Sequence, residues 1–176
     1  MNKPSGKVPT VADIQVFSPH PNAPWNSKSG GRLWVEFAFA DRAGFQALSY
    51  EEEELRRLSH DIRGIRRYTV SGMPKWGRGG GEWHRIRQEF VGVNEGSVSW
   101  VCEDLFGNKR QFDLKAKGDS IWMPPFILHT YTVHEEGSEL WVFANTIFPP
   151  DDPSAHDTYS LEAFQELQAE FARAPK

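Results

Sequence analysis

The chain has 176 residues, a formal net charge of −4 and a pI near 5.9, with 39% hydrophobic and 25% charged residues. This balance is typical of one soluble globular domain, and the negative charge argues against a protein that follows nucleic-acid phosphates. The sequence shows neither an apolar run of about eighteen residues nor the apolar core of a signal peptide. We therefore expect a cytoplasmic protein with no membrane and no nucleic acid among its partners.

The first third of the chain predicts an arm, a strand and a helix. Residues 1–30 are rich in Pro, Gly, Ser and Asn, so we expect an arm over the domain or over a partner subunit, with at most one short strand around residues 11–17. Aromatic and branched residues at 32–39 predict the strand that opens a barrel. Acidic residues in the first turn and arginines in the last turn predict a short inserted helix at 49–58.

The central part of the chain predicts many short strands without helices between them. Asn94-Glu95-Gly96 and Phe106-Gly107-Asn108 are typical of hairpin turns that need a positive φ, and Pro124-Pro125 ends one strand. Such spacing is typical of a closed all-β barrel. The expected strands are at residues 65–70, 83–87, 90–93, 97–103, 110–114, 120–123, 129–134 and 139–146.

The last part of the chain predicts a helix. Ser160 is a suitable N-cap, and an apolar stripe at helical spacing follows it, formed by Leu161, Phe164, Leu167 and Phe171. This stripe predicts docking on the barrel or on a second subunit. The expected organisation is an arm at 1–30, a barrel at 31–150, and a turn with a helix at 151–176.

Four side chains form a candidate site in the barrel. Glu82 and His84 lie two residues apart in an expected strand, so both point to one face. Glu89 follows after a turn, and His129 belongs to a different strand. Two imidazoles and two carboxylates can hold Fe(II), Mn(II), Ni(II) or Zn(II). One hypothesis is therefore a divalent transition metal bound by Glu82, His84, Glu89 and His129.

The other hypothesis needs no metal. Carboxyls and imidazoles that share an apolar barrel shift one another's pKa and can move a proton next to a carbonyl. Glu82, His84 and His129 are then the catalytic candidates. Tyr131 shares the face of His129 and is either an oxyanion donor or a core aromatic residue.

Arginines close to the glycine-rich run 77–81 are the candidates for an anionic substrate. Arg78, Arg85 and Arg87 either meet such a substrate or are solvated strand charges. His156 lies in a segment rich in Pro and Asp, and we expect it to face solvent.

Two motifs make the chain similar to the cupins. Glu82, His84, Glu89 and Gly96 have the spacing of the first cupin motif, with Glu82 where the first His is expected. The second motif runs from Gly118 through Pro124 and His129 to Val133, with Phe126 and Val133 where Gly and Asn are usual. The chain resembles the WxcM-like group, which includes FdtA/QdtA-type dTDP-sugar 3,4-ketoisomerases and the cupin half of capsular-sugar epimerases and reductases. Further resemblance lies in Ile65-Arg66-Arg67-Tyr68, the turn at 104–108, Ile121-Trp122-Met123-Pro124-Pro125, the segment 144–153 and Asp157-Thr158-Tyr159.

The resemblance implies a single cupin barrel (a double-stranded β-helix or jelly roll), a homodimer, and a small-molecule substrate. It also implies a His pair that serves as acid and base on a dTDP-linked keto sugar; His84 matches one member and Glu82 replaces the other. We therefore predict a cupin enzyme that isomerises or epimerises a small carbonyl substrate, a nucleotide-linked keto sugar. The alternatives are a metal-dependent dioxygenase or lyase, and a non-catalytic ligand-binding cupin.

Overall fold

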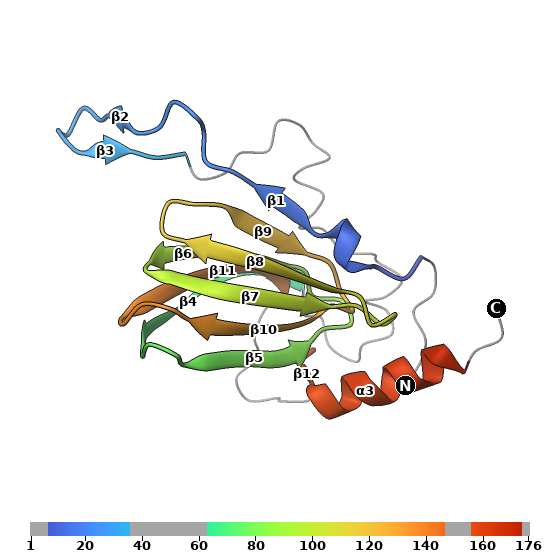
Figure 1. Ribbon diagram of the computed structural model, residues 1–176. Helices are drawn as coiled ribbons and strands as arrows, with labels where there is room; N and C mark the ends of the chain where they lie inside the picture. Colours follow the sequence, from blue (N-terminus) through green and yellow to red (C-terminus); the bar gives the residue numbers. More distant parts are fainter. Residues whose placement is uncertain (1–6, 36–62, 147–155, 174–176) are drawn as a thin grey trace.

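The computed structural model describes residues 7–35, 63–146 and 156–173. The expected helix at 49–58 and residues 36–39 of the first expected strand lie outside these ranges. Within them the chain forms antiparallel β-strands, a 3₁₀ turn η1 and a helix α3 (Figure 1). In chain order the elements are η1 Val11–Asp13, β1 Gln15–Phe17, β2 Trp25–Asn26, β3 Arg32–Leu33, β4 Arg63–Met73, β5 Arg78–Trp83, β6 Glu89–Glu95, β7 Ser97–Glu103, β8 Lys109–Lys115, β9 Ser120–Met123, β10 Leu128–Val133, β11 Ser138–Thr146, β12 Tyr159–Ser160 and α3 Leu161–Ala172.

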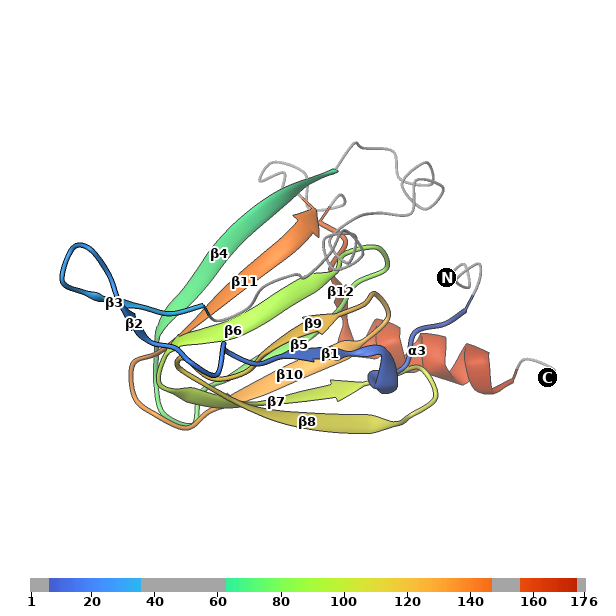
Figure 2. The ribbon, with the colours of Figure 1, turned by 90° about the horizontal axis from the view of Figure 1, so that it is seen from above.

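Two five-stranded sheets form the body of the molecule (Figures 1 and 2). One has the order β1-β9-β6-β11-β4, and the other has the order β12-β5-β10-β7-β8. In β7 every second side chain is buried, which places Val98, Trp100 and Cys102 in the core between the sheets. This alternation is the pattern from which the sequence predicted a barrel, and the all-β class is confirmed.

The hairpin turns have the predicted backbone conformation. Gly96 and Gly107 have φ angles of 73° and 83°, a region that favours glycine. A Cβ atom at Gly96 would also lie 2.1 Å from the Ser138 hydroxyl, so this turn requires glycine for space as well. Strand β9 ends at Met123, directly before Pro124-Pro125, as expected.

The N-terminal arm adds to one sheet. Strand β1 pairs antiparallel with β9, with Gln15 opposite Trp122, so this part of the arm lies along the barrel. Strands β2 and β3 pair with each other in a separate two-stranded ribbon that extends away from the two large sheets (Figure 1). Strand β3 therefore does not open the barrel, because its partner is β2.

The expected strand at 83–87 is wrong beyond its first residue. Strand β5 covers Arg78–Trp83, and residues 84–88 form no regular strand. The backbone N–H groups of residues 85–87 donate to the Asp157 carboxylate instead of to a neighbouring strand. A side chain from far along the sequence thus replaces the strand partner.

Helix α3 docks on the outside of the second sheet (Figure 1). The Ser160 hydroxyl accepts a hydrogen bond from the Ala163 N–H at 3.4 Å and caps the helix, as predicted. Phe164 and Leu167 are buried against Trp83, Leu105, Phe126 and Leu128. Phe171 is partly buried against this cluster, but Leu161, which was also predicted to belong to the apolar stripe, is 39% exposed. Among the described residues no helix has the length and apolar character needed to cross a membrane.

Replacement of Phe164 by alanine tests this docking. The ring is fully buried, and its centroid lies 5.8 Å from that of Trp83, so Phe164→Ala leaves a cavity. We expect the free energy of unfolding, measured with urea, to fall by about 3–5 kcal/mol. The matched control is Leu161→Ala on the same helix, for which we expect a change below about 1 kcal/mol. Equal effects of the two substitutions would contradict the docked arrangement.

Candidate active site

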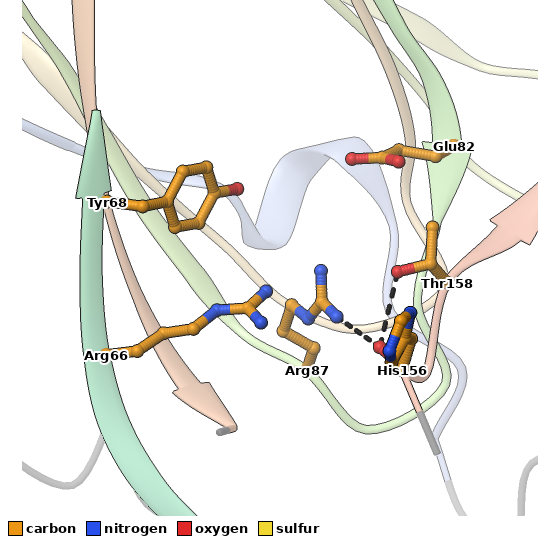
Figure 3. Close-up of a pocket in the computed structure, with 6 residues that line it drawn as sticks. All are labelled: Arg66, Tyr68, Glu82, Arg87, His156 and Thr158. Atoms are coloured by element: carbon orange, nitrogen blue, oxygen red, sulfur yellow. Dashed lines mark hydrogen bonds between the residues drawn. The ribbon is translucent and has the colours of Figure 1, made fainter. Parts of the chain in front are cut away.

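A cavity of about 460 Å³ lies between the two sheets (Figure 3). Arg66 and Tyr68 come from β4 of one sheet, and Glu82 comes from β5 of the other. Figure 3 shows the Tyr68 and Glu82 side chains on opposite sides of the space. The remaining lining residues are Arg87, His156 and Thr158.

The Glu89 carboxylate is the centre of the polar cluster behind this cavity. It is 2% exposed, and its two oxygens lie 3.5 Å from His84 Nε2 and 3.6 Å from His129 Nε2. Arg87 Nη1 lies 3.5 Å from Glu89 Oε1, and the Tyr68 hydroxyl donates to the same oxygen at 3.2 Å. One buried carboxylate thus meets two imidazoles, a guanidinium and a phenol.

Burial and charge act in opposite directions on this cluster. Burial raises the pKa of Glu89, but His84, His129 and Arg87 outweigh it and hold this pKa below the usual 4.5. The pKa of His129 is lowered, mainly by burial and also by His84, while Glu89 opposes the shift. Burial, together with Glu89, raises the pKa of Tyr68. At neutral pH Glu89 is therefore ionised and Tyr68 remains a donor.

Backbone carbonyls determine which imidazole nitrogens face the carboxylates. His84 Nδ1 lies 2.7 Å from the Asp157 carbonyl oxygen, and His129 Nδ1 lies 3.3 Å from that of Ile127. A carbonyl oxygen only accepts, so each Nδ1 carries a proton and each Nε2 is the atom that gains or loses one. Both Nε2 atoms point toward Glu89.

Glu82 connects this cluster to the cavity. Its Oε1 lies 3.9 Å from His129 Nε2, and its side chain is 38% exposed, whereas both imidazoles are buried. The structure thus brings together Glu82, His84, Glu89 and His129, the four residues that the sequence predicted as neighbours. Of these four, Glu82 is the one that lines the large cavity.

Three of the four also have the spacing of a metal site. One ligand atom from each of Glu82, His84 and His129 lies within 4.8 Å of the other two. These nitrogen and oxygen donors suit a divalent transition metal, so the residues fit such an ion. Glu89, the fourth predicted ligand, contacts Arg87 and Tyr68 as well as the imidazoles.

Tyr131 lies apart from the Glu89 cluster. Its ring and that of His129 both stack on Trp100, with centroids 5.1 Å and 5.5 Å away, so the two residues share a face as expected. Tyr131 is further along β10, however, and lies over Gly79, where a Cβ atom would come within 2.2 Å of its ring. It lines a second cavity of about 330 Å³ beside the glycine-rich segment. Burial, and secondarily Glu82, raises the pKa of its hydroxyl.

Sequence reasoning missed part of the cavity wall. Arg66 and Tyr68 alternate along β4, a signal that places them on one face, but they were noted only as part of the family resemblance. His156, expected to face solvent, lines the cavity beside Thr158. No local pattern marks His156, and Thr158 belongs only to the family resemblance at residues 157–159; the C-terminal segment carries both to the site.

Two guanidinium groups give the cavity a positive wall. Arg87 is buried; its Nε donates to Thr146 Oγ1 at 3.2 Å, and its Nη2 donates to the His156 carbonyl. Figure 3 shows the Arg66 guanidinium directed toward that of Arg87. The pKa of Arg66 is lowered by burial and then by the charge of Arg87. Two such groups side by side suit an anion, because it relieves their repulsion and accepts their N–H groups.

The family model described as "FdtA: WxcM-like, C-terminal" matches residues 37–162, and the chain belongs to this family. A comparison with curated protein sequences found no match.

Solved structures with the same cupin fold include three sugar-nucleotide enzymes. QdtA, a sugar 3,4-ketoisomerase from Thermoanaerobacterium thermosaccharolyticum in complex with TDP, is 15% identical with a TM-score of 0.60, covering 92% of this chain and 98% of that one. WlaRA, a TDP-fucose-3,4-ketoisomerase from Campylobacter jejuni, is 14% identical with a TM-score of 0.59 and coverages of 91% and 98%. A dTDP-4-dehydrorhamnose 3,5-epimerase from Elizabethkingia anophelis is 16% identical with a TM-score of 0.55 and coverages of 88% and 78%.

The low pKa of Glu89 leads to a prediction about acid stability. A carboxyl whose pKa is lower in the folded chain contributes stability above its unfolded pKa, near 4.5, and this contribution is lost as the pH falls below that value. We expect Glu89→Gln to lower the free energy of unfolding at neutral pH by about 3 kcal/mol, because the buried Arg87 guanidinium loses its partner. The variant should also lose less stability than the unsubstituted protein as the pH falls below 4.5. Urea denaturation across pH measures both effects.

The matched control for this measurement is Glu95→Gln, an exposed carboxylate at the other end of β6. Because this side chain is exposed, the unfolding free energy of the variant at neutral pH should stay within about 0.5 kcal/mol of that of the unsubstituted protein. If Glu89→Gln behaved in the same way as Glu95→Gln, the charge assignment for Glu89 would be wrong.

Proposed function

We propose that this protein isomerises or epimerises a nucleotide-linked keto sugar by proton transfer. The observation that carries the proposal is the Glu82 carboxylate, which faces a cavity and is backed by the buried His129 and Glu89. Family membership supports the same chemistry. QdtA has also been solved, as a variant, in complex with TDP-4-keto-6-deoxyglucose, which indicates a suitable test substrate.

The proposed reaction begins at the carbon next to the substrate carbonyl. Glu82, as the base, takes the proton from this carbon, and the bond electrons move toward the carbonyl oxygen to form an enediolate, whose oxygen then takes a proton from solvent to give an enediol. Return of a proton to the former carbonyl carbon, with loss of the other hydroxyl proton, moves the carbonyl by one carbon. Return to the same carbon from the opposite face inverts its configuration instead.

His129 and Glu89 assist Glu82 in this proposal. The proton that Glu82 accepts can pass to His129 Nε2, and the imidazolium so formed is stabilised by the ionised Glu89. His84 Nε2 contacts Glu89 from the other side, 3.5 Å from Oε1. The separations of 3.5–3.9 Å exceed hydrogen-bond lengths, and such contacts often shorten when substrate binds.

Arg66 and Arg87 provide the proposed contact for the charged part of the substrate. A diphosphate carries the negative charge that a pair of guanidinium groups binds well. The wall formed by Arg66 and Arg87 belongs to the same cavity as Glu82, so one ligand can reach both.

A second candidate function uses a metal. Glu82, His84 and His129 would hold a divalent ion, which when bound supplies a Lewis acid that polarises a carbonyl or activates dioxygen. We favour proton transfer without a metal because Glu89, the carboxylate that contacts both imidazoles, already has the buried Arg87 guanidinium beside it as a positively charged partner.

Replacement of Glu82 tests its role as the base. We expect the unsubstituted protein in D₂O to incorporate deuterium next to the carbonyl of TDP-4-keto-6-deoxyglucose, followed by NMR. Glu82→Gln keeps the shape of the side chain but cannot take the proton, so exchange should slow by about 10²–10⁴-fold. Affinity for TDP should change little, and Glu95→Gln should exchange at the unsubstituted rate.

Elemental analysis separates the two candidates. A stoichiometric transition metal in the purified protein that disappears in His84→Ala, together with exchange that stops on chelation, would replace the metal-free account. Absence of exchange by the unsubstituted protein would contradict the keto-sugar assignment.

A pair of adjacent arginines tests the anion contact. Arg66 is half-buried and lines the cavity, whereas Arg67 is exposed and lies over the Phe143 ring, 5.9 Å from its centroid. Hydrogen bonds to charged groups contribute about 1.5–3 kcal/mol, so we expect Arg66→Ala to weaken TDP binding by about 10–100-fold in calorimetry. Arg67→Ala is the matched control and should bind TDP normally. Equal loss in both variants would mean that only net charge matters.

A further inference from the structure

Asp157 lies outside both cupin motifs, yet its carbonyl group and carboxylate form four hydrogen bonds with residues 84–87. Its side chain is buried, and its carboxylate accepts three successive backbone N–H groups. Oδ1 accepts from Arg85 at 3.0 Å, and Oδ2 accepts from Ile86 at 3.0 Å and from Arg87 at 2.7 Å. This carboxylate therefore sets the path of the backbone between Trp83 and Glu89.

The carbonyl group of the same residue acts on an imidazole. It accepts a hydrogen bond from His84 Nδ1 at 2.7 Å, which leaves His84 Nε2 facing Glu89. Asp157 has a φ angle of 49°, in the left-handed region that aspartate tolerates better than most residues. In this conformation both the carbonyl group and the carboxylate of Asp157 form hydrogen bonds with residues 84–87.

Neighbouring residues extend this attachment. Tyr159 and Ser160 pair with Trp83 and Glu82, and the Trp83 indole N–H donates to the Ser160 carbonyl at 3.1 Å. The His156 carbonyl accepts from Arg87. The C-terminal segment of residues 156–160 therefore holds the segment of residues 82–87 along its length.

We propose that Asp157 is a positioning residue for the reaction: it orients His84 and Arg87 and, through the Nδ1 bond, fixes the tautomer that presents His84 Nε2 to Glu89. Its effect on catalysis rests on the proposed function, but its effect on the tautomer does not. Asp157 itself does not line the cavity and acts through the residues that it holds.

A second buried carboxylate serves as a control that distinguishes a residue that positions catalytic groups from one that only anchors the chain. Asp104 is also buried, and it accepts backbone N–H groups from Val11 at 3.1 Å, Phe106 at 2.9 Å and Asn108 at 3.0 Å. It joins the N-terminal arm to the β7–β8 turn and is not part of the Glu89 cluster. Asp157→Asn and Asp104→Asn therefore remove the same kind of interaction at two places in the fold.

The test measures the ¹⁵N NMR shifts of the His84 ring in the full chain at one fixed alkaline pH. We expect the unsubstituted protein and Asp104→Asn to show a proton on Nδ1. An asparagine cannot accept all three N–H groups, because its NH₂ replaces one oxygen. Asp157→Asn should therefore loosen the segment and give a mixture of tautomers.

Kinetics supply the second measurement. With TDP-4-keto-6-deoxyglucose, we expect Asp157→Asn to lower kcat by about 100-fold, the size of effect that a misplaced group produces, and Asp104→Asn to leave kcat within about threefold. Both variants should lose thermal stability, so Tm alone does not separate the two roles.

Three results would overturn the proposal. Unchanged His84 shifts in Asp157→Asn, with a Tm loss equal to that of Asp104→Asn, would make Asp157 an anchor only. A proton on Nε2 in the unsubstituted protein would remove the tautomer argument without any variant, even if Asp157→Asn did not fold. An unchanged kcat in Asp157→Asn would exclude a positioning role in catalysis. If no form of the protein turned over the substrate, the proposed function would fail while the NMR result would still decide the tautomer.

Discussion

The site depends on a charged carboxylate in the interior of a β-barrel. An ionised carboxyl is costly to bury unless cations and donors surround it, and Glu89 is surrounded by His84, His129, Arg87 and the Tyr68 hydroxyl. These partners come from three places in the fold: β4, the segment after β5, and β10. The need to neutralise one charge therefore determines where both imidazoles and one arginine lie.

The two sheets and the C-terminal segment each supply a different part of the site. The sheets supply the apolar core and place Tyr68 opposite Glu82. Between β5 and β6 the chain has no strand partner, and Asp157 satisfies its backbone instead. An irregular segment can thus be well defined inside a barrel, because a buried carboxylate supplies the acceptors that a sheet would otherwise provide.

Much of the fold followed from local patterns, whereas part of the site did not. Alternation in β7 and glycines with positive φ at residues 96 and 107 are local signals, and both were predicted correctly. The grouping of Glu82, His84, Glu89 and His129 followed from motif spacing. The strand expected at 83–87 ended early because its competitor, Asp157, is distant in sequence. His156 and Thr158 were missed for the same reason, since tertiary docking alone brings them to the cavity.

The attachment of residues 156–160 also has a consequence for the order in which the chain acquires its site during synthesis. The barrel strands through β11 are complete at Thr146, before His156, Asp157 and Thr158 have been made. Once β11 has emerged from the ribosome, strands β1 to β11 can pair around the core. The acceptors for Arg87 and His84, which are the carbonyl groups of His156 and Asp157, have not yet been made. The polar cluster therefore cannot reach its described geometry until residues 156–158 have emerged, after the strands from β1 to β11 have been made.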